Sequence, residues 1–372
     1  MFPHPFRWLR TAASMFVAAS LLTALPAQTQ TETVSPSLLP PPAPMAVPAP
    51  GPAGDGPYQP QPIVAGGAII PLYPPDSPLL KPERLREPEK YHYYSPTEVG
   101  YVINIHNPSI EFHPGNGQLN TGACIILAAG GGHRTLNVGP EGADFVHFFK
   151  GHGISTVILR NRLRSDGYDP RIDGVNDTLQ AVKLVRAHAK AWNLDPAKIG
   201  IMGFSAGAEL ASGAALFYPE FDRTHDVPAN PLAKVTSRPD FVGIIYPGPS
   251  PFARGGSVPI PRDAPPVFFA TGGWGDWIHA LWATEYFTAL LKDAVPNVEF
   301  HVYARGRHPG DKAPPDEPPA TGGLTNRGFT AFGSWQDQYI QWFRDLGFFG
   351  KPGVPTLAAK DVAANVDRKP RM

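Results

Sequence analysis

The chain has 372 residues, of which 42% are hydrophobic and 17% are charged, a balance typical of a globular protein with a sizeable core. Its 32 basic and 32 acidic residues give a formal net charge of zero, which excludes the broadly electropositive surface that nucleic acids and anionic membranes attract. We therefore expect a neutral or small substrate and no nucleic-acid partner. The single cysteine, Cys124, cannot form an intrachain disulfide and lies in an apolar run, so we expect a buried, inert thiol.

The first 27 residues have the pattern of a secretory signal peptide. Arg7 and Arg10 precede an apolar run over residues 12–25, and small residues suited to cleavage follow near Ala27. The run is short for a bilayer span and is interrupted by serine and threonine. We predict an exported protein, secreted or periplasmic, with no membrane span after cleavage.

Residues 28–88 are predicted to form a proline-rich, disordered linker. They are crowded with proline, glycine and alanine and show no sustained hydrophobic period. A proline-rich ligand for a partner is the alternative, but no charged residues frame the early part of the segment, so we favour a spacer. We infer no obligate protein partner. A catalytic domain over 89–350 and a flexible tail over 351–372 complete the predicted organisation.

Within the predicted catalytic domain, short β-rich runs alternate with helical patterns. The clearest helix covers 177–192, and others are expected after residue 205, at 280–294 and at 335–346. The alternation predicts an eight-stranded, mostly parallel sheet with helices on both faces and a site at the carboxyl ends of the strands. The eight predicted strands lie at 99–106, 110–113, 123–129, 155–160, 198–202, 241–246, 267–271 and 298–303.

The most informative motif is G-F-S-A-G at residues 203–207. It lies between the apolar run 198–202 and the small-residue run 208–213, an order that indicates strand, sharp turn and helix. In a G-x-S-x-G turn the serine is lifted above the sheet, and the glycines let strand and helix approach closely. Ser205 is therefore the predicted nucleophile.

A nucleophilic serine needs a histidine base and an acid that orients this base. Asp276 follows the predicted strand 267–271, and His308 follows the predicted strand 298–303. The order Ser, Asp, His, with each group just past a strand, is that of α/β-hydrolases. We predict a catalytic set of Ser205, Asp276 and His308.

An oxyanion hole needs backbone N–H groups beside the nucleophile. Gly131 and Gly132 follow the third predicted strand, and Ala206 follows the serine, so we predict these three residues as donors. The glycine run lacks the G-K-[ST] ending of a phosphate-binding loop, and the histidines near it lack a compact ligand spacing. We predict no cofactor and no metal.

The region 101–349 resembles secreted bacterial α/β-hydrolases of the acetyl esterase and acetylxylan esterase type, often grouped with feruloyl-esterase-like domains. A-G-G-G-H at 129–133 is similar to the P-G-G-G-Y motif of that group, with alanine and histidine replacing the outer residues. Glu141-Gly142, Arg162-Leu163 and the stretch 195–207 also match its motifs, and His308 lies where its late histidine does, followed here by Pro309-Gly310. The resemblance implies deacylation of small esters, commonly on plant cell-wall sugars.

We therefore expect an exported serine esterase that cleaves small acyl esters, free or on carbohydrate, through an acyl-enzyme. Two alternatives stay open: a serine peptidase of the prolyl-oligopeptidase type, and a catalytically silent binding domain.

Three residues are candidates for substrate binding, namely His133, Trp274 and Trp277. The tryptophans flank the predicted acid, where they would stack on a sugar, line an acyl pocket or simply pack at a rim. The insertion 309–333 after the predicted base is either a lid or a surface insert.

Overall fold

The computed structural model describes residues 56–96, 98–225, 232–310, 315, 324 and 332–367. These residues all lie within one of the two units into which the chain divides, Ser37–Met372. The predicted signal peptide, the start of the predicted linker and most of the insertion 309–333 lie outside the described residues. None of the described helices is both long and apolar enough to cross a bilayer.

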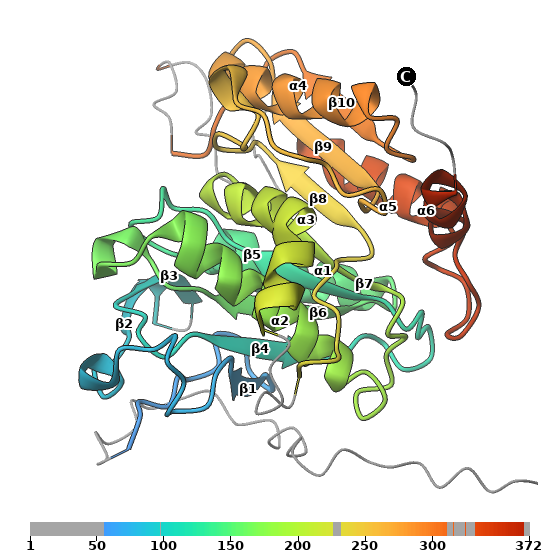
Figure 1. Cartoon of the computed structure of the whole chain (residues 1–372). Helices are drawn as coiled ribbons and strands as arrows, with labels where there is room; N and C mark the ends of the chain where they lie inside the picture. Colours follow the sequence, from blue (N-terminus) through green and yellow to red (C-terminus); the bar gives the residue numbers. More distant parts are fainter. Residues whose placement is uncertain are drawn as a thin grey trace, which may run out of the picture. The chain divides into compact units, whose positions relative to one another are not determined.

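An eight-stranded sheet organises the described chain, as predicted (Figure 1). The five pairings from β6 through β5, β7, β8 and β9 to β10 are parallel, whereas β1 and β4 extend the sheet in antiparallel pairings. In order across the sheet the strands are β1 (Ala68–Pro71), β4 (Ser109–His113), β6 (Ser155–Arg160), β5 (Cys124–Ala128), β7 (Ile199–Phe204), β8 (Val242–Ile245), β9 (Val267–Gly272) and β10 (Glu299–Tyr303).

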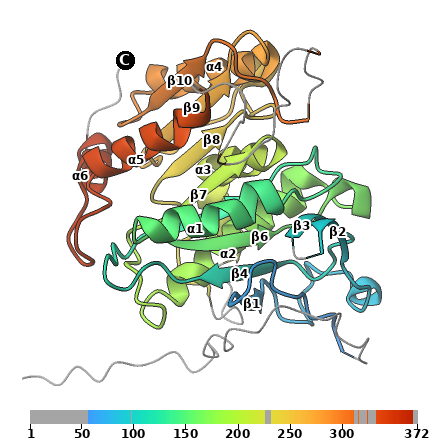
Figure 2. The ribbon, with the colours of Figure 1, turned by 180° about the vertical axis from the view of Figure 1, so that it is seen from behind.

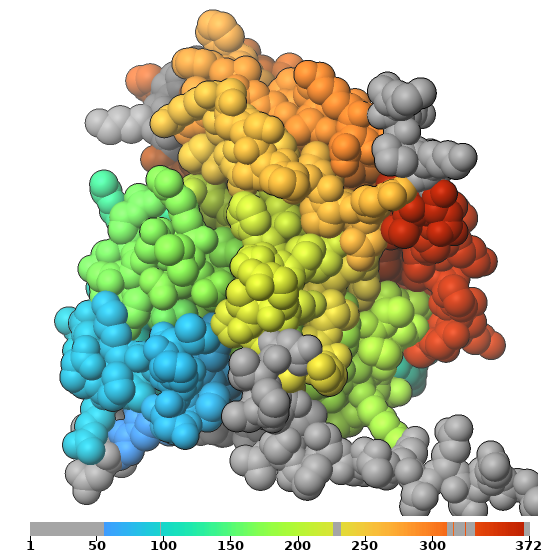
Figure 3. Space-filling model, in the orientation of Figure 1, coloured from blue at the N-terminus to red at the C-terminus, as the bar shows by residue number. Residues whose placement is uncertain are grey.

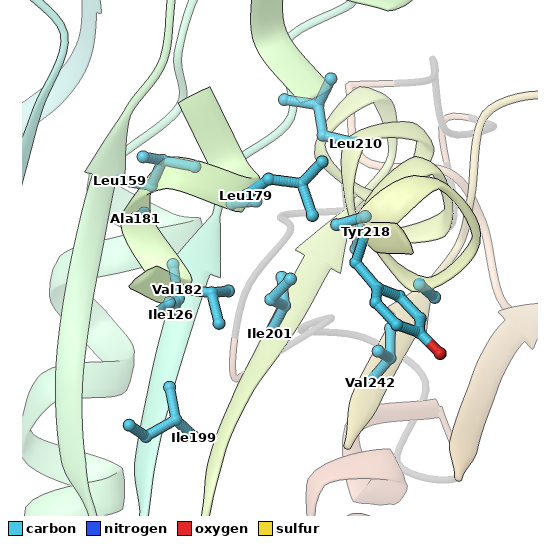
Figure 4. Close-up of a cluster of buried hydrophobic side chains, with 14 of the residues drawn as sticks. Ile126, Leu159, Leu179, Ala181, Val182, Ile199, Ile201, Leu210, Tyr218 and Val242 are labelled. Carbon is cyan, nitrogen blue, oxygen red and sulfur yellow. The ribbon is translucent and has the colours of Figure 1, made fainter. Parts of the chain in front are cut away.

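Helices cover both faces of this sheet, which divides the core into two clusters. One face carries α2 (Val175–Ala187), α3 (Ala206–His225) and α4 (Trp277–Lys292), and the other carries α1 (Asp144–Gly151), α5 (Trp335–Asp345) and α6 (Leu357–Val366) (Figures 1 and 2). Figure 4 shows side chains of α2 and α3 meeting those of β5 and β7 in the first cluster. The central strands are buried on both sides, which explains their continuous apolar runs.

One of the eight strands predicted for the main sheet lies elsewhere in the structure. The run expected at 99–106 forms β3 (Glu98–Ile103), which pairs with β2 (Lys90–Ser95) in a separate two-stranded sheet. The eighth strand of the main sheet is β1, which the sequence assigned to the linker. Because β1 is a four-residue edge strand ending in Pro71, its sequence carries little strand signal.

The described part of the predicted linker is therefore packed, not disordered. Leu72, Tyr73 and Leu80 are buried, and the backbone carbonyls of Leu72 and Leu79 accept hydrogen bonds from Gln180 (3.0 Å) and Arg162 (2.7 Å). Figure 3 shows the surface of the first described part of the chain, in blue, lying against the green middle part of the chain. A proline-rich segment can pack in this way because its extended backbone forms few β-sheet hydrogen bonds. Its carbonyl groups are therefore available to accept hydrogen bonds from side chains of the core.

The predicted flexible tail also differs from the structure over residues 351–367. Thr356 caps α6 by accepting a hydrogen bond from the Ala359 N–H (3.0 Å), and Ala358 is buried. Buried Lys198 donates to the carbonyl of Gly350 (2.7 Å), which fixes the approach to this helix. The tail was missed because its alanine-rich helix presents few large apolar side chains.

Candidate active site

Ser205 lies at the turn between β7 and α3, at the carboxyl end of a central strand. Its backbone has a left-handed conformation, with φ at 49°, which is strained for a residue other than glycine. Glycine is required on either side, because a Cβ at Gly203 would overlap Gly207 and a Cβ at Gly207 would overlap the carbonyl of Ala128. The sequence therefore folds here into the sharp turn that exposes the serine hydroxyl.

The structure brings the three predicted catalytic side chains together. Ser205 Oγ lies 2.9 Å from His308 Nε2, and His308 Nδ1 lies 3.3 Å from Asp276 Oδ2. The Asp276 side chain is only 1% exposed, and that of His308 is 15% exposed. A β-bridge between Gly275 and Arg307 holds the loops that carry the acid and the histidine side by side. This arrangement can pass a proton from the serine hydroxyl to the imidazole.

The glycine loop after β5 lies beside this serine. Gly131 and Gly132 have φ values of 122° and 62°, and a Cβ at Gly131 would overlap Thr135, so the loop requires glycine at this position. Gly131, Gly132 and Ala206 line the same cavity as Ser205. The three predicted oxyanion donors are therefore placed around one space.

The buried side chain of Glu141 is hydrogen-bonded to the glycine loop. Its side chain accepts hydrogen bonds from the Gly130 N–H (2.7 Å) and from the Tyr246 hydroxyl (3.0 Å). Burial raises the pKa of this carboxyl group to about 7, although both hydrogen bonds act in the opposite direction. The Tyr246 ring in turn meets the His308 ring edge to face, with centroids 5.5 Å apart. Glu141 thus connects the glycine loop to the histidine side of the site.

The cavity at Ser205 has a volume of about 350 Å³. Among the described residues that line it, backbone-rich and polar surfaces combine with three aromatic rings, the indole of Trp282 and the imidazoles of His279 and His308, and none is Leu, Ile, Val, Met or Phe. The lining residues are Gly131, Gly132, Asn137, Glu141, Ser205, Ala206, Glu209, Gly248, Pro249, His279, Trp282, His308 and Pro309.

The predicted substrate-binding residues do not line this cavity. Trp274 and Trp277 are 82% and 66% exposed, and the tryptophan of the cavity wall is Trp282 instead. His133 is buried, and its Nε2 lies 3.3 Å from a carboxylate oxygen of Glu209, which does line the cavity. His133 therefore reaches the cavity only through Glu209.

His279, like Trp282, is a residue of the site that sequence reasoning missed. Its Nδ1 donates to Asp276 Oδ1, and its ring stacks on that of His308 at 3.8 Å between centroids. The signal was a histidine three residues after the predicted acid, at the start of a helix, where i and i+3 side chains are neighbours.

Asp276, His279 and His308 also form the one group of potential metal ligands found in the described part of the chain, with ligand atoms within 4.8 Å of one another. Two of those contacts are the hydrogen bonds to Asp276 already described. We assign the three side chains to these hydrogen bonds and not to an ion.

The comparisons with known proteins agree with this architecture. Residues 114–244 match the BD-FAE family model. The structure resembles the acetyl ester-xyloside bifunctional hydrolase of Caldicellulosiruptor lactoaceticus, with a TM-score of 0.57 and 24% identity over 76% of this chain and 98% of that one. It also resembles esterase 2 of Thermogutta terrifontis in its butyrate-bound form, with a TM-score of 0.51 and 17% identity over 71% of this chain and 96% of that one.

The chain has the α/β-hydrolase fold. The hydrolase fold places Ser205, Asp276 and His308 after β7, β9 and β10, at the carboxyl ends of three parallel strands. The predicted fold class and the resemblance to acetyl and acetylxylan esterases are thereby confirmed.

Curated relatives match parts of this hydrolase fold. An acetylxylan esterase of Xylanibacter ruminicola is 34% identical over 99 residues, which are 27% of this chain and 20% of that protein. The endo-1,4-beta-xylanase B of Butyrivibrio fibrisolvens is 30% identical over 171 residues, which are 44% of this chain and 24% of that protein. The chain thus matches between a fifth and a quarter of the length of these relatives.

Proposed function

We propose that this protein is a serine carboxylesterase that removes small acyl groups, acetyl above all, from hydroxyl groups of carbohydrates. The observation that carries the proposal is the 2.9 Å contact of Ser205 Oγ with His308 Nε2 beside the glycine loop. The names of its relatives, an acetylxylan esterase and an acetyl ester-xyloside hydrolase, support the choice of ester and of sugar. The N-terminal pattern supports export as part of the same proposal.

In the proposed reaction, Ser205 Oγ attacks the acyl carbon while His308 Nε2 takes the hydroxyl proton. The N–H groups of Gly131, Gly132 and Ala206 stabilise the oxyanion of the tetrahedral intermediate, a contribution of about 3 kcal/mol for each donor. His308 then returns its proton to the leaving alcohol, and an acyl-serine remains. Water, deprotonated by the same histidine, attacks this ester. The bond from the acyl carbon to Ser205 Oγ then breaks, the acid is released, and His308 returns the proton to Ser205 Oγ.

The walls of the cavity favour a short acyl group. A long alkyl chain gains affinity by burying apolar surface, at about 25 cal/mol per Å², but of the described lining residues only Trp282, Ala206 and the two prolines offer such surface. Asn137 and Glu209 instead present hydrogen-bonding groups suited to the hydroxyls of a sugar. An ester of a small acyl group with a polar alcohol fits both the limited apolar surface and the hydrogen-bonding groups of the cavity.

A substrate panel tests this proposal. The 4-nitrophenyl esters of acetate, butyrate and ferulate, acetylated xylan and a peptide 4-nitroanilide are assayed with the full chain. We expect kcat/KM to fall at least about tenfold from acetyl to butyryl, since the described lining offers the extra methylenes little apolar surface, and we expect acetate release from acetylated xylan. Faster cleavage of the feruloyl ester or of the amide, or no cleavage of any substrate, would contradict the proposal.

A further inference from the structure

The Asp276 carboxylate is hydrogen-bonded to two imidazole rings at once. Its Oδ2 faces His308 Nδ1 at 3.3 Å, and its Oδ1 accepts a hydrogen bond from His279 Nδ1. The two rings lie parallel, with an interplanar angle of 12° and 3.8 Å between centroids. The carboxylate therefore holds a pair of stacked histidines, of which His308 is hydrogen-bonded to Ser205.

This arrangement replaces the usual role of an aspartate at the start of a helix. Asp276 is the N-cap residue of α4, where an aspartate normally accepts a hydrogen bond from a backbone N–H of the first turn. The Asp276 side chain forms no such cap. Its Oδ1 instead accepts a hydrogen bond from the side chain of His279, the third residue of the helix. The carboxylate is thus held by a side chain in an orientation that leaves its second oxygen for His308.

The ring of His279 is also held in place by Trp282, which lies on the same helix. The ring of Trp282 meets it edge to face, with centroids 5.1 Å apart at 90°, and the guanidinium of Arg254 lies 5.6 Å from the centre of the Trp282 ring. His279 is 18% exposed and lines the cavity, so it is neither a core residue nor a free surface group. A buried carboxylate oxygen without a donor is costly, and His279 supplies the donor for Oδ1.

We propose that His279 is a positioning residue of the esterase: its Nδ1–H fixes Asp276 Oδ1, so that Oδ2 of the same carboxylate orients His308. This inference rests on the proposed function. Since His279 acts through Asp276 and His308, its loss should lower kcat and leave KM nearly unchanged.

Three variants separate the hydrogen bond from the ring. His279→Ala removes both, His279→Asn keeps a short N–H donor near the Nδ1 position, and His279→Phe keeps an aromatic ring without the donor. With 4-nitrophenyl acetate we expect kcat to fall about tenfold in His279→Ala and His279→Phe, with KM within twofold, and to recover within about threefold of the wild type in His279→Asn.

His301→Ala is the matched control, because His301 is also bonded to a carboxylate, that of Glu299 at 2.7 Å, but lies on β10 outside the cavity. Its kcat should stay within twofold of the wild type. Thermal unfolding of each variant verifies that α4 is intact, and any variant that unfolds early is assayed below its transition.

The inference is wrong if His279→Ala keeps kcat within twofold, if only KM changes, or if His279→Phe recovers activity and His279→Asn does not. Each of these results leaves the proposed esterase intact as long as replacement of Ser205 abolishes turnover. Turnover that survives the loss of Ser205 would instead overturn the proposed function itself.

Discussion

Ser205→Ala is expected to lower the turnover of an acetyl ester by about 10⁵-fold or more, because no other group can form the acyl-enzyme once the hydroxyl is gone. The melting temperature should stay within a few degrees of the wild type, since the turn depends on Gly203 and Gly207 and alanine adds no atom to it. Initial rates with 4-nitrophenyl acetate and a thermal melt measure the two quantities.

Ser212→Ala is the control for this variant. Ser212 lies in the same helix, α3, where its hydroxyl donates only to the Ala208 carbonyl at 2.7 Å. It should keep wild-type turnover. A Ser205→Ala protein that retains more than a few per cent of the activity would show that another nucleophile performs the reaction.

Glu141→Gln is expected to remove a pH dependence of stability worth about 3 kcal/mol. The pKa of Glu141 is raised by burial from 4.5 to about 7, so the folded state holds a proton that the unfolded state releases between these pH values. A raised pKa stabilises the fold fully below pH 4.5, and this contribution is lost as the pH rises through 7. Glutamine resembles the protonated form at every pH, and its carbonyl oxygen can still accept from the Gly130 N–H.

Urea unfolding of both proteins from pH 4.5 to 8 measures this effect. The free energy of unfolding of the wild type, relative to Glu141→Gln, should fall across that range. Tyr246→Phe removes a hydroxyl that lowers the pKa of Glu141, so its loss of stability should extend to higher pH. A difference between wild type and Glu141→Gln that stays constant with pH would contradict this assignment.

The sheet and its central turn were predictable because they rest on local patterns. Strands buried on both faces, such as β5 and β7, appear as continuous apolar runs, and the turn at Ser205 needs glycine on both sides. Asp276 and His308 followed from their positions just past two further strands. Each of these features is encoded within a few neighbouring residues.

The features that the sequence did not reveal depend on distant partners. β1 becomes a strand only because β4 offers an edge, and the carbonyl of Leu79 is held by Arg162, which is itself paired with buried Asp177 at 2.7 Å. His279 gains its place only when β10 brings His308 alongside it, so its helical pattern carries no sign of the stacking. The exposure of Trp274 likewise depends on how the loop between β9 and α4 lies in the folded chain, where its N–H donates to the Ala304 carbonyl, and not on its neighbours in sequence.

The most direct test of the central claim is to identify the residue that a fluorophosphonate modifies in the full chain. The protein is treated with the probe, digested and examined by peptide mass spectrometry, while residual esterase activity is followed in parallel. We expect one adduct, on Ser205, in proportion to the activity lost, and no adduct in Ser205→Ala. A fully inactivated protein that carries the adduct elsewhere, or an active protein that the probe never modifies, would contradict the central claim.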